Sequence, residues 1–342
     1  MIAPAFDAMK TVLLLLVVGG LGFGGWYAWS NRQAPGVPAA EQPPGELPPG
    51  GGLELGGSTP VLQQPATLPP EIQQALAAGD ALWNQAGATP TNSAQAPEMN
   101  RRYSAALRLM YNKPGLRERE EQLLQERLTP LGNALFFSKT VYPDDGQFSS
   151  HTVVSGENPE TIAKKNGISR ELMNRFRGKD ANDAKLRVGD TFKIIKLAGQ
   201  TDPQKRGYAL HIDKGDYVLD CFIAGMFARR YTCSIGAAAS PTPVGKTHVF
   251  NRVWHPDWTH PITHQVIPYG QPDHLLGPVW LPFDGKELGR SGIGIHGYTG
   301  SDAKWAAQVS NGCIRLPNDK AEELYQTVCH PDRSPIAVEI VE

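Results

Sequence analysis

Hydrophobic residues change their spacing along this chain, and each change marks a segment boundary. The first segment is a charge-free run over residues 11–29, bracketed by Lys10 and Arg32. As a helix this run would span about 28 Å, close to the roughly 30 Å hydrocarbon core of a bilayer. Because the run is longer than the apolar part of a usual signal peptide, we predict an uncleaved transmembrane anchor at residues 1–32. A cleaved signal peptide is the alternative.

The apolar periodicity disappears in the next segment. Residues 33–70 contain ten prolines and seven glycines, and such a stretch cannot bury enough apolar surface to offset the entropy of ordering. We interpret it as a linker. Helical spacing of apolar residues returns at 71–140, in three stretches that each begin at or after a proline. These residues are predicted to form a small helical region, whose role the sequence does not indicate.

Two further segments follow with other patterns. Residues 148–198 read as strand, helix, helix and strand, and Gly167 is placed to end the first helix. Residues 206–342 carry short alternating stretches that proline and glycine interrupt, with a clear helical stripe at 320–328. The predicted fold is therefore multidomain: a transmembrane helix, a small helical region, an α+β module and a mostly β domain.

Composition and charge limit the possible partners and cofactors. The chain has 342 residues with a formal net charge of −1, so it is not built to neutralise a nucleic-acid backbone. Five histidines lie between residues 248 and 274, but prolines interrupt their spacing and no zinc-binding helix motif is present. We therefore predict no nucleic acid, no metal and no cofactor.

The four cysteines are too few to form a disulfide scaffold in a chain of this length. Cys221 and Cys233 lie on adjacent predicted strands, but the turn between them would place Cys221 opposite residue 228. This register argues against a disulfide between the two. A bond that involves Cys329 stays open.

Residues 148–198 resemble a LysM (lysin motif) domain. The resemblance rests on the stretches TVVSGENPETIAKKNGIS and LRVGDTFKI. It implies a βααβ module that binds N-acetylglucosamine-containing glycans such as peptidoglycan. The chain departs from the family at Glu157, Asn158 and Arg177, which correspond to positions near the glycan groove. A module that is retained only as a spacer is the alternative.

Candidate chemistry lies in the last segment, where the sequence GIHGY at 294–298 is followed by SNGCIRL at 310–316. An unperturbed thiol is only a few per cent thiolate at neutral pH, so a histidine that accepts its proton makes it a nucleophile. His296 can take the proton of Cys313 and later return one to a leaving amine. The N–H groups of Gly312 and Cys313 could face a developing oxyanion. The spacing alone equally allows a buried structural cysteine beside an unrelated histidine.

The two stretches together resemble the catalytic signature of the L,D-transpeptidases (YkuD-type catalytic domain). The similarity covers about residues 207–341. By this resemblance Cys313 is the nucleophile, His296 is the general base and acid, and the backbone carbonyl of Gly297 orients the imidazole. Three further residues match positions near the substrate or the oxyanion: Gly312, Ser310 and Arg315.

The resemblance also implies a reaction and a location. Cys313 would attack a peptidoglycan stem tetrapeptide after its third residue, release D-alanine, and pass the acyl group to an amine of another stem, which forms a 3→3 cross-link. With water as the acceptor, the same intermediate gives carboxypeptidase activity. A peptidoglycan-binding protein with an inactive catalytic domain is the alternative from another class. We expect a membrane-anchored, extracytoplasmic protein whose partners are peptidoglycan and the membrane.

Overall fold

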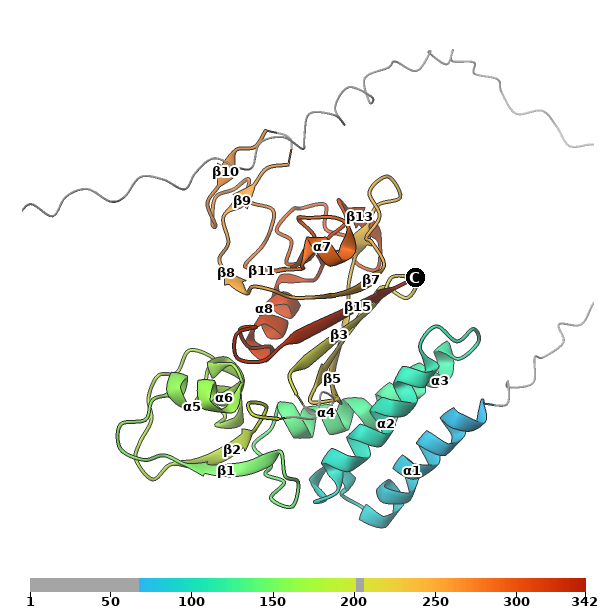
Figure 1. Ribbon diagram of the computed structural model, residues 1–342, viewed down its shortest axis with the longest axis vertical. Coiled ribbons are helices and arrows are strands. Elements are labelled where there is room, and N and C mark those ends of the chain that lie inside the picture. Colours follow the sequence, from blue (N-terminus) through green and yellow to red (C-terminus); the bar gives the residue numbers. More distant parts are fainter. Residues whose placement is uncertain (1–67, 201–205, 262) are drawn as a thin grey trace, which may run out of the picture. The chain divides into compact units, whose positions relative to one another are not determined.

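The computed structural model describes residues 68–200, 206–261 and 263–342, which all belong to one compact unit (Figure 1). The predicted membrane anchor at 1–32 and residues 33–67 of the predicted linker lie outside this part of the chain. Among the residues that the structure describes, no helix is both long enough and apolar enough to cross a bilayer.

The first described elements are helices that pack against one another. The third predicted helical stretch is divided, because a π-helical turn separates two α-helices directly before Pro130. Proline has no N–H to donate to the preceding turn, and a widened turn accommodates this loss. The bounds are α1 (Pro70–Ala86), the 3-10 helix η1 (Pro90–Asn92), α2 (Ala96–Met110), α3 (Arg117–Leu123), the π-helical turn η2 (Leu124–Leu128) and α4 (Thr129–Phe136).

The next elements have the predicted order of strand, helix, helix and strand. At the start of α5, the Asn158 side chain accepts from the Thr161 N–H at 2.9 Å, which is half of a capping box. Gly167 ends α5 in the left-handed conformation, with φ of 73°. The bounds are β1 (Phe148–Thr152), α5 (Pro159–Asn166), α6 (Arg170–Phe176) and β2 (Thr191–Ile195), and β1 pairs antiparallel with β2.

Two residues that depart from the LysM pattern make local structural bonds. Glu157 accepts from the Val154 N–H at 3.0 Å, and its carboxylate lies 2.9 Å from His151 Nε2. Arg177 donates to Asn174 Oδ1 at 2.7 Å and to the Lys185 carbonyl, so it fixes the loop after α6. Both contacts support the fold of the module. They do not test glycan binding, which stays a prediction.

The remaining residues form a mostly β domain, as the sequence predicts. Its largest sheet has the strand order β5-β4-β3-β15-β7, in which β15 runs parallel to β3 and the other neighbours are antiparallel. The tight turn between β4 and β5 lies at Ala224 and Gly225, where both residues have positive φ. The bounds are β3 (Tyr208–Asp213), β4 (Val218–Ile223), β5 (Met226–Thr232), β7 (Gly245–His248) and β15 (Ile336–Val341).

A second sheet of four short strands, in the order β14-β12-β11-β8, lies in the same domain. Two strand pairs, β6 with β13 and β9 with β10, complete the β structure, and the predicted helical stripe at 320–328 corresponds to α8. The bounds are β6 (Ile235–Gly236), β8 (Val253–Trp254), β9 (Trp258–Thr259), β10 (Val266–Ile267), β11 (Val279–Pro282), α7 (Gly285–Leu288), β12 (Gly294–His296), β13 (Gln308–Ser310), β14 (Ile314–Arg315) and α8 (Asn318–Thr327).

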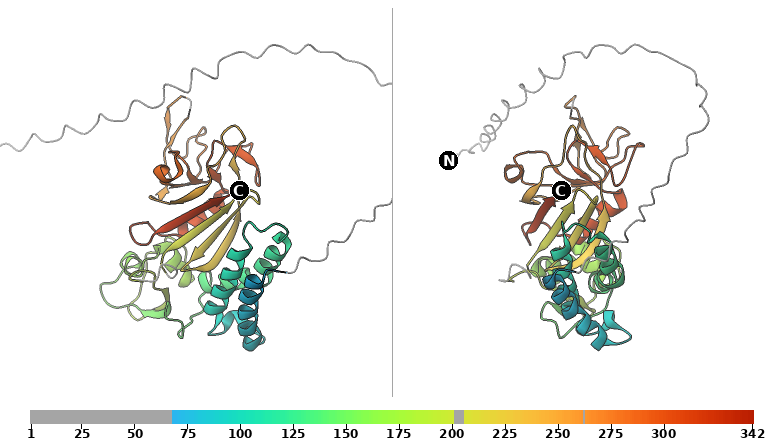
Figure 2. Two further views of the ribbon diagram at one scale, coloured as in Figure 1. Left: turned by 45° about the vertical axis from the view of Figure 1, so that its right-hand side comes forward. Right: turned by 90° about the vertical axis from the view of Figure 1, so that its right-hand side faces the viewer.

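The helical region packs against an edge of the five-stranded sheet. β5 is an edge strand, and α2 and α4 both pack against it (Figure 2). Asn100 Nδ2 donates to the Phe227 carbonyl at 2.9 Å, and the Phe227 N–H donates to Ser104 Oγ at 2.8 Å. The pairing of β4 with β5 is irregular next to Phe227, so α2 supplies bonds there that a further strand would otherwise make.

The βααβ module is also packed onto its neighbours. Ser169 Oγ donates to the Gln326 carbonyl of α8 at 2.5 Å, and Ser334 Oγ donates to the Gly167 carbonyl at 2.9 Å. On the other side, the buried amine of Lys193 in β2 donates to the Leu135 carbonyl at 2.8 Å, close to the end of α4. The module therefore contacts both the helical region and the mostly β domain.

Candidate active site

Strand register places the candidate nucleophile and base on one face. β12 and β14 are parallel neighbours, with Ile295 opposite Ile314 and His296 opposite Arg315. Both isoleucines are fully buried. Because side chains alternate along a strand, His296 and Arg315 point to the other face, and so does Cys313, which directly precedes β14. Cys313, His296 and Arg315 all line one cavity of about 540 Å³.

The His296 imidazole is held by backbone carbonyls. Its Nδ1 donates to the Gly297 carbonyl and lies 3.2 Å from the Leu276 carbonyl, and the side chain is 6% exposed. The Gly297 contact is the one that the resemblance implies. With the proton on Nδ1, Nε2 is left with a lone pair that can accept a proton. Burial, together with the charge of Arg315, lowers the pKa of His296 to about 4, so the imidazole is neutral at neutral pH.

The Cys313 thiol is also neutral at rest. Burial raises its pKa above the ordinary value, and the Gly294 N–H and the charges of Arg315 and Arg290 only partly oppose this. Its Sγ lies 3.5 Å from the Gly292 carbonyl. The site therefore holds an uncharged thiol and an uncharged imidazole rather than a preformed ion pair. A proton must leave Cys313 as it attacks a substrate.

Hydrogen bonds from Ser310 and Thr242 shape the loop that carries Cys313. Ser310 Oγ accepts from the Gly312 N–H at 3.1 Å and donates to the Cys313 carbonyl at 2.6 Å. Thr242 Oγ1 donates to the Gly312 carbonyl at 2.9 Å. In this resting geometry the Gly312 N–H is bonded to Ser310, so its expected role toward an oxyanion stays a prediction. Ser310 lines the cavity, but its hydroxyl is used to hold the loop.

A glycine is needed at position 312 because of its backbone conformation and because there is no room for a side chain. Its φ is +104°, which side chains rarely adopt, and a Cβ there would lie 2.9 Å from Arg290 Nη1. Arg290 itself donates to the Pro241 carbonyl at 2.9 Å and to the Asn311 carbonyl at 2.8 Å. This arginine ties the Cys313 loop to the loop after β6. No sequence signal pointed to Arg290, since its partners are distant along the chain.

The guanidinium of Arg315 stacks on an aromatic ring at the cavity. Its central carbon lies 4.0 Å from the centre of the Tyr298 ring, and the Tyr298 hydroxyl donates to Asp302 at 2.8 Å. Within the described residues, Arg315 Nε has no hydrogen-bond partner. Trp280, opposite His296 on β11, borders the imidazole with a ring separation of 6.0 Å. Tyr298 lies within the quoted stretch GIHGY, whereas Trp280 lies outside both quoted stretches.

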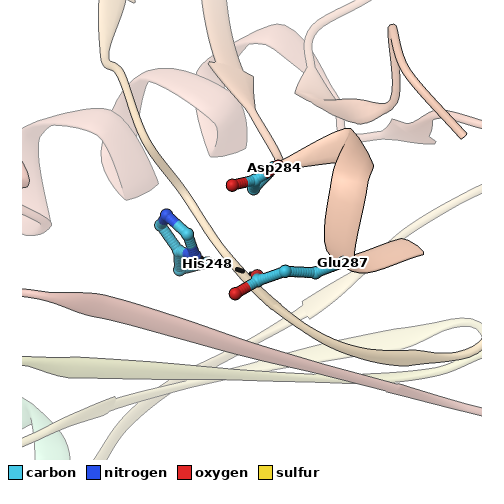
Figure 3. Close-up of side chains that lie close together, drawn as sticks. All are labelled: His248, Asp284 and Glu287. Carbon is cyan, nitrogen blue, oxygen red and sulfur yellow. Dashed lines mark hydrogen bonds and ion pairs between the residues drawn. The ribbon is translucent and has the colours of Figure 1, made fainter. Parts of the chain in front are cut away.

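One group of residues has the types and spacing of metal ligands. The ligand atoms of His248, Asp284 and Glu287 lie within 4.8 Å of one another (Figure 3). His248 Nδ1 is 2.9 Å from Glu287 Oε2, and Asp284 Oδ1 accepts from the Lys286 N–H at 2.8 Å at the start of α7. These contacts join β7 to α7. The four cysteines are all free thiols.

Comparisons with known proteins match the catalytic domain. Residues 207–336 match the family model of the L,D-transpeptidase catalytic domain. A Bacillus subtilis protein, YqjB, whose name marks it as a candidate L,D-transpeptidase, is 33% identical over 111 residues. That match covers 32% of this chain and 58% of YqjB, so it spans little more than half of the relative. The prediction of an L,D-transpeptidase-type catalytic domain is confirmed, whereas the LysM-like module stays a prediction.

Solved L,D-transpeptidase structures show a more distant similarity. A cysteine-to-serine mutant from Enterococcus faecium has a TM-score of 0.32 and 18% identity, over 50% of this chain and 62% of that chain. L,D-transpeptidase 3 from Mycobacterium tuberculosis has a TM-score of 0.32 and 16% identity, over 46% of this chain and 77% of that chain. These similarities are too low to support a conclusion about function.

Proposed function

We propose that this protein is a cysteine acyltransferase that forms 3→3 cross-links between peptidoglycan stem peptides. The observation that carries the proposal is the shared cavity of Cys313 and His296, in which the imidazole is oriented by the Gly297 carbonyl. This cavity lies within the residues that match the L,D-transpeptidase catalytic domain. The same arrangement argues against a protein that only binds peptidoglycan, because both residues needed for acyl transfer are present.

The neutral pair defines the order of proton transfer. The Cys313 sulfur attacks the carbonyl after the third stem residue while His296 Nε2 takes the thiol proton. The tetrahedral intermediate then collapses to a thioester, and the imidazolium gives its proton to the leaving amine of D-alanine. In the second half, an amine of another stem attacks the thioester and gives its proton to His296. The C–S bond then breaks, and the imidazolium returns that proton to the sulfur, which restores the free thiol. Because Gly312 is engaged, we assign oxyanion binding to the Cys313 N–H and the Arg315 guanidinium.

One feature of the cavity supports an amine acceptor over water. Asp257 is the only carboxylate among the described residues that line it, and it belongs to the segment that leads into β9. A side-chain ammonium of a diamino acid would be attracted to this carboxylate. We therefore place transpeptidation ahead of carboxypeptidase activity, which uses the same thioester with water.

We further propose an extracytoplasmic location, with residues 1–32 as a membrane anchor and the LysM-like module as a glycan contact. A pull-down of the full chain on insoluble peptidoglycan tests the module. Retention should fall when the loop of the module is altered by Arg177→Ala. If the wild-type protein is not retained, the module does not bind glycan and has only a structural role.

Muropeptide mass spectrometry tests the catalytic assignment. Incubation of the full chain with disaccharide tetrapeptides should give a cross-linked dimer and free D-alanine. Cys313→Ala should abolish both products, because both arise from the thioester. Cys329→Ala is the matched control, since Cys329 belongs to the same domain but does not line the cavity. D-alanine release by Cys313→Ala at the wild-type rate would mean that another residue is the nucleophile.

A further inference from the structure

Three loops of the mostly β domain meet at the side chain of Arg290, which lies in the turn between α7 and β12. The guanidinium donates to Ser240 Oγ at 2.7 Å and to the Pro241 carbonyl at 2.9 Å, in the loop between β6 and β7. It also donates to the Asn311 carbonyl at 2.8 Å, two residues before Cys313. One planar side chain therefore joins three segments that lie far apart in the sequence.

The bond to Asn311 fixes the backbone that leads to the nucleophile. A peptide unit is planar, so a bond that holds its carbonyl also sets the direction of its N–H. Arg290 holds the carbonyl of the Asn311–Gly312 peptide, and Thr242 Oγ1 holds the carbonyl of the Gly312–Cys313 peptide. The Cys313 N–H, which we assign to the oxyanion, belongs to the second of these units. Two successive peptide planes are thus oriented by residues outside the loop.

The charge of Arg290 is not neutralised by its partners, which are two carbonyls and a hydroxyl. In the part of the chain that the structure describes, no carboxylate forms an ion pair with it. Burial raises the pKa of the Cys313 thiol, and the charges of Arg315 and Arg290 partly oppose this effect. The positive charge of Arg290 therefore favours the thiolate.

Arg290 differs from the other charged or titratable groups around the thiol, because it does not line the cavity. The groups that do line it are Asp257, His260, His296, Tyr298 and Arg315. A change in any of these would alter the surface that receives a substrate as well as the thiol. A change at Arg290 acts on Cys313 from outside the cavity, so its effect can be measured separately.

We propose that Arg290 is a positioning residue for the reaction at Cys313. It holds the loop in the shape that directs the Cys313 N–H toward the oxyanion, and its uncompensated charge stabilises the thiolate as it forms. This inference rests on the proposed function, in which Cys313 is the nucleophile. A lysine can supply the charge but not the planar fork that reaches three acceptors, so substitution can separate the two contributions.

Two rates measured on the purified full chain test the proposal. The first is alkylation of Cys313 by iodoacetamide at pH 7, followed by peptide mass spectrometry, which reports the thiolate and needs no peptidoglycan. The second is D-alanine release from disaccharide tetrapeptides, which reports the whole reaction. Urea unfolding followed by circular dichroism shows whether each variant keeps its fold.

The two substitutions of Arg290 should affect the two rates differently. Arg290→Gln should slow alkylation roughly three- to tenfold, the effect of removing one nearby charge, and should also slow D-alanine release. Arg290→Lys should be alkylated at the wild-type rate but should release D-alanine roughly tenfold more slowly or worse, because the oxyanion donor is misplaced. Lys286→Gln is the matched control: it removes a positive charge from the exposed face of α7, and both rates should stay unchanged.

Three results would overturn the proposal. Wild-type rates in Arg290→Gln would show that the side chain is not needed, and equally slow alkylation in Arg290→Lys and Arg290→Gln would show that the charge has no separate effect. Loss of the fold in either variant would assign Arg290 a general structural role. If the wild-type chain releases no D-alanine, the proposed function fails, whereas the alkylation rates still measure the effect of Arg290 on the thiol.

Discussion

The contact between α2 and β5 predicts a measurable stability effect from two buried side chains. Asn100 and Ser104 are both fully buried, and Ser104 Oγ donates to Asn100 Oδ1 at 2.9 Å. Together they satisfy both backbone groups of Phe227 on the edge strand. Asn100→Ala leaves the Phe227 carbonyl without its donor, and Ser104→Ala leaves the Phe227 N–H without its acceptor. Each change leaves that backbone group unsatisfied and also breaks the bond between the two side chains.

The magnitude follows from the cost of an unsatisfied buried group, which is about 1–3 kcal/mol. Each single variant should lose about this much free energy of unfolding, which lowers the melting temperature by about 2–4 °C per kcal/mol in a domain of this size. The double variant should lose less than the sum, because the two side chains also bond to each other and form one network.

Urea unfolding of the purified full chain, followed by circular dichroism, measures these losses. Gln122→Ala is the control, because Gln122 lies in the same helical region and makes an exposed bond to Glu126; its effect should stay within about 0.5 kcal/mol. Single variants that match the control would show that α2 does not stabilise the edge strand. If the double variant loses as much free energy of unfolding as the two single variants together, the two side chains do not form one network.

Three further predictions concern the site and the module. Arg315→Gln removes a charge that lowers the pKa of both His296 and Cys313. The acid limb of the pH–rate profile for D-alanine release is set by His296, whose pKa is about 4, and this limb should move to higher pH. Alkylation of Cys313 at a fixed pH should become slower, because less of the thiol is ionised. Movement of the acid limb to lower pH would contradict the assignment. Ser310→Ala removes two of the hydrogen bonds that hold the Cys313 loop and should cost about 1–3 kcal/mol in urea unfolding. D-alanine release should fall more than alkylation of Cys313. Unchanged release would show that the loop keeps its shape without Ser310. Burial lowers the pKa of Lys193 to about 7, so the folded state favours the neutral amine, and stability should rise between pH 7 and about 10, by up to about 1.4 kcal/mol per pH unit. Lys193→Met should flatten that rise in urea titrations at several pH values, and an equally steep rise in the variant would assign it to other groups.

The local features of this protein were predictable because their causes are local. Alternation and turn residues predicted the mostly β domain, and Gly167 predicted the end of α5. The signature around Cys313 predicted the contact between His296 and the Gly297 carbonyl, because neighbouring residues make it. What could not be predicted depends on partners far apart in sequence. Asn100 and Phe227 are separated by 127 residues, and nothing in the periodicity of either segment indicates that they meet.

The role of Gly312 shows the same limit within the site. A glycine next to a candidate nucleophile suggested a free N–H for an oxyanion, and the motif alone contains no counter-evidence. The structure instead uses Ser310, two residues earlier, to accept that N–H. The glycine is required by its positive φ and by the nearness of Arg290, a residue outside the motif. The sequence therefore pointed to the right glycine, but the reason that a glycine is needed there is its backbone conformation and the nearby Arg290.

The separated pKa values of Cys313 and His296 explain how one site can hold a nucleophile without keeping it charged. Burial raises the pKa of the thiol above its ordinary value of 9.0 and lowers the pKa of the imidazole to about 4. Both shifts oppose transfer of the proton from the thiol to the imidazole in the resting site. The ion pair is therefore formed only as a substrate carbonyl accepts the electrons of sulfur. Because water alone offers no such acceptor, the free enzyme keeps a protonated thiol, and nucleophilicity appears with the substrate.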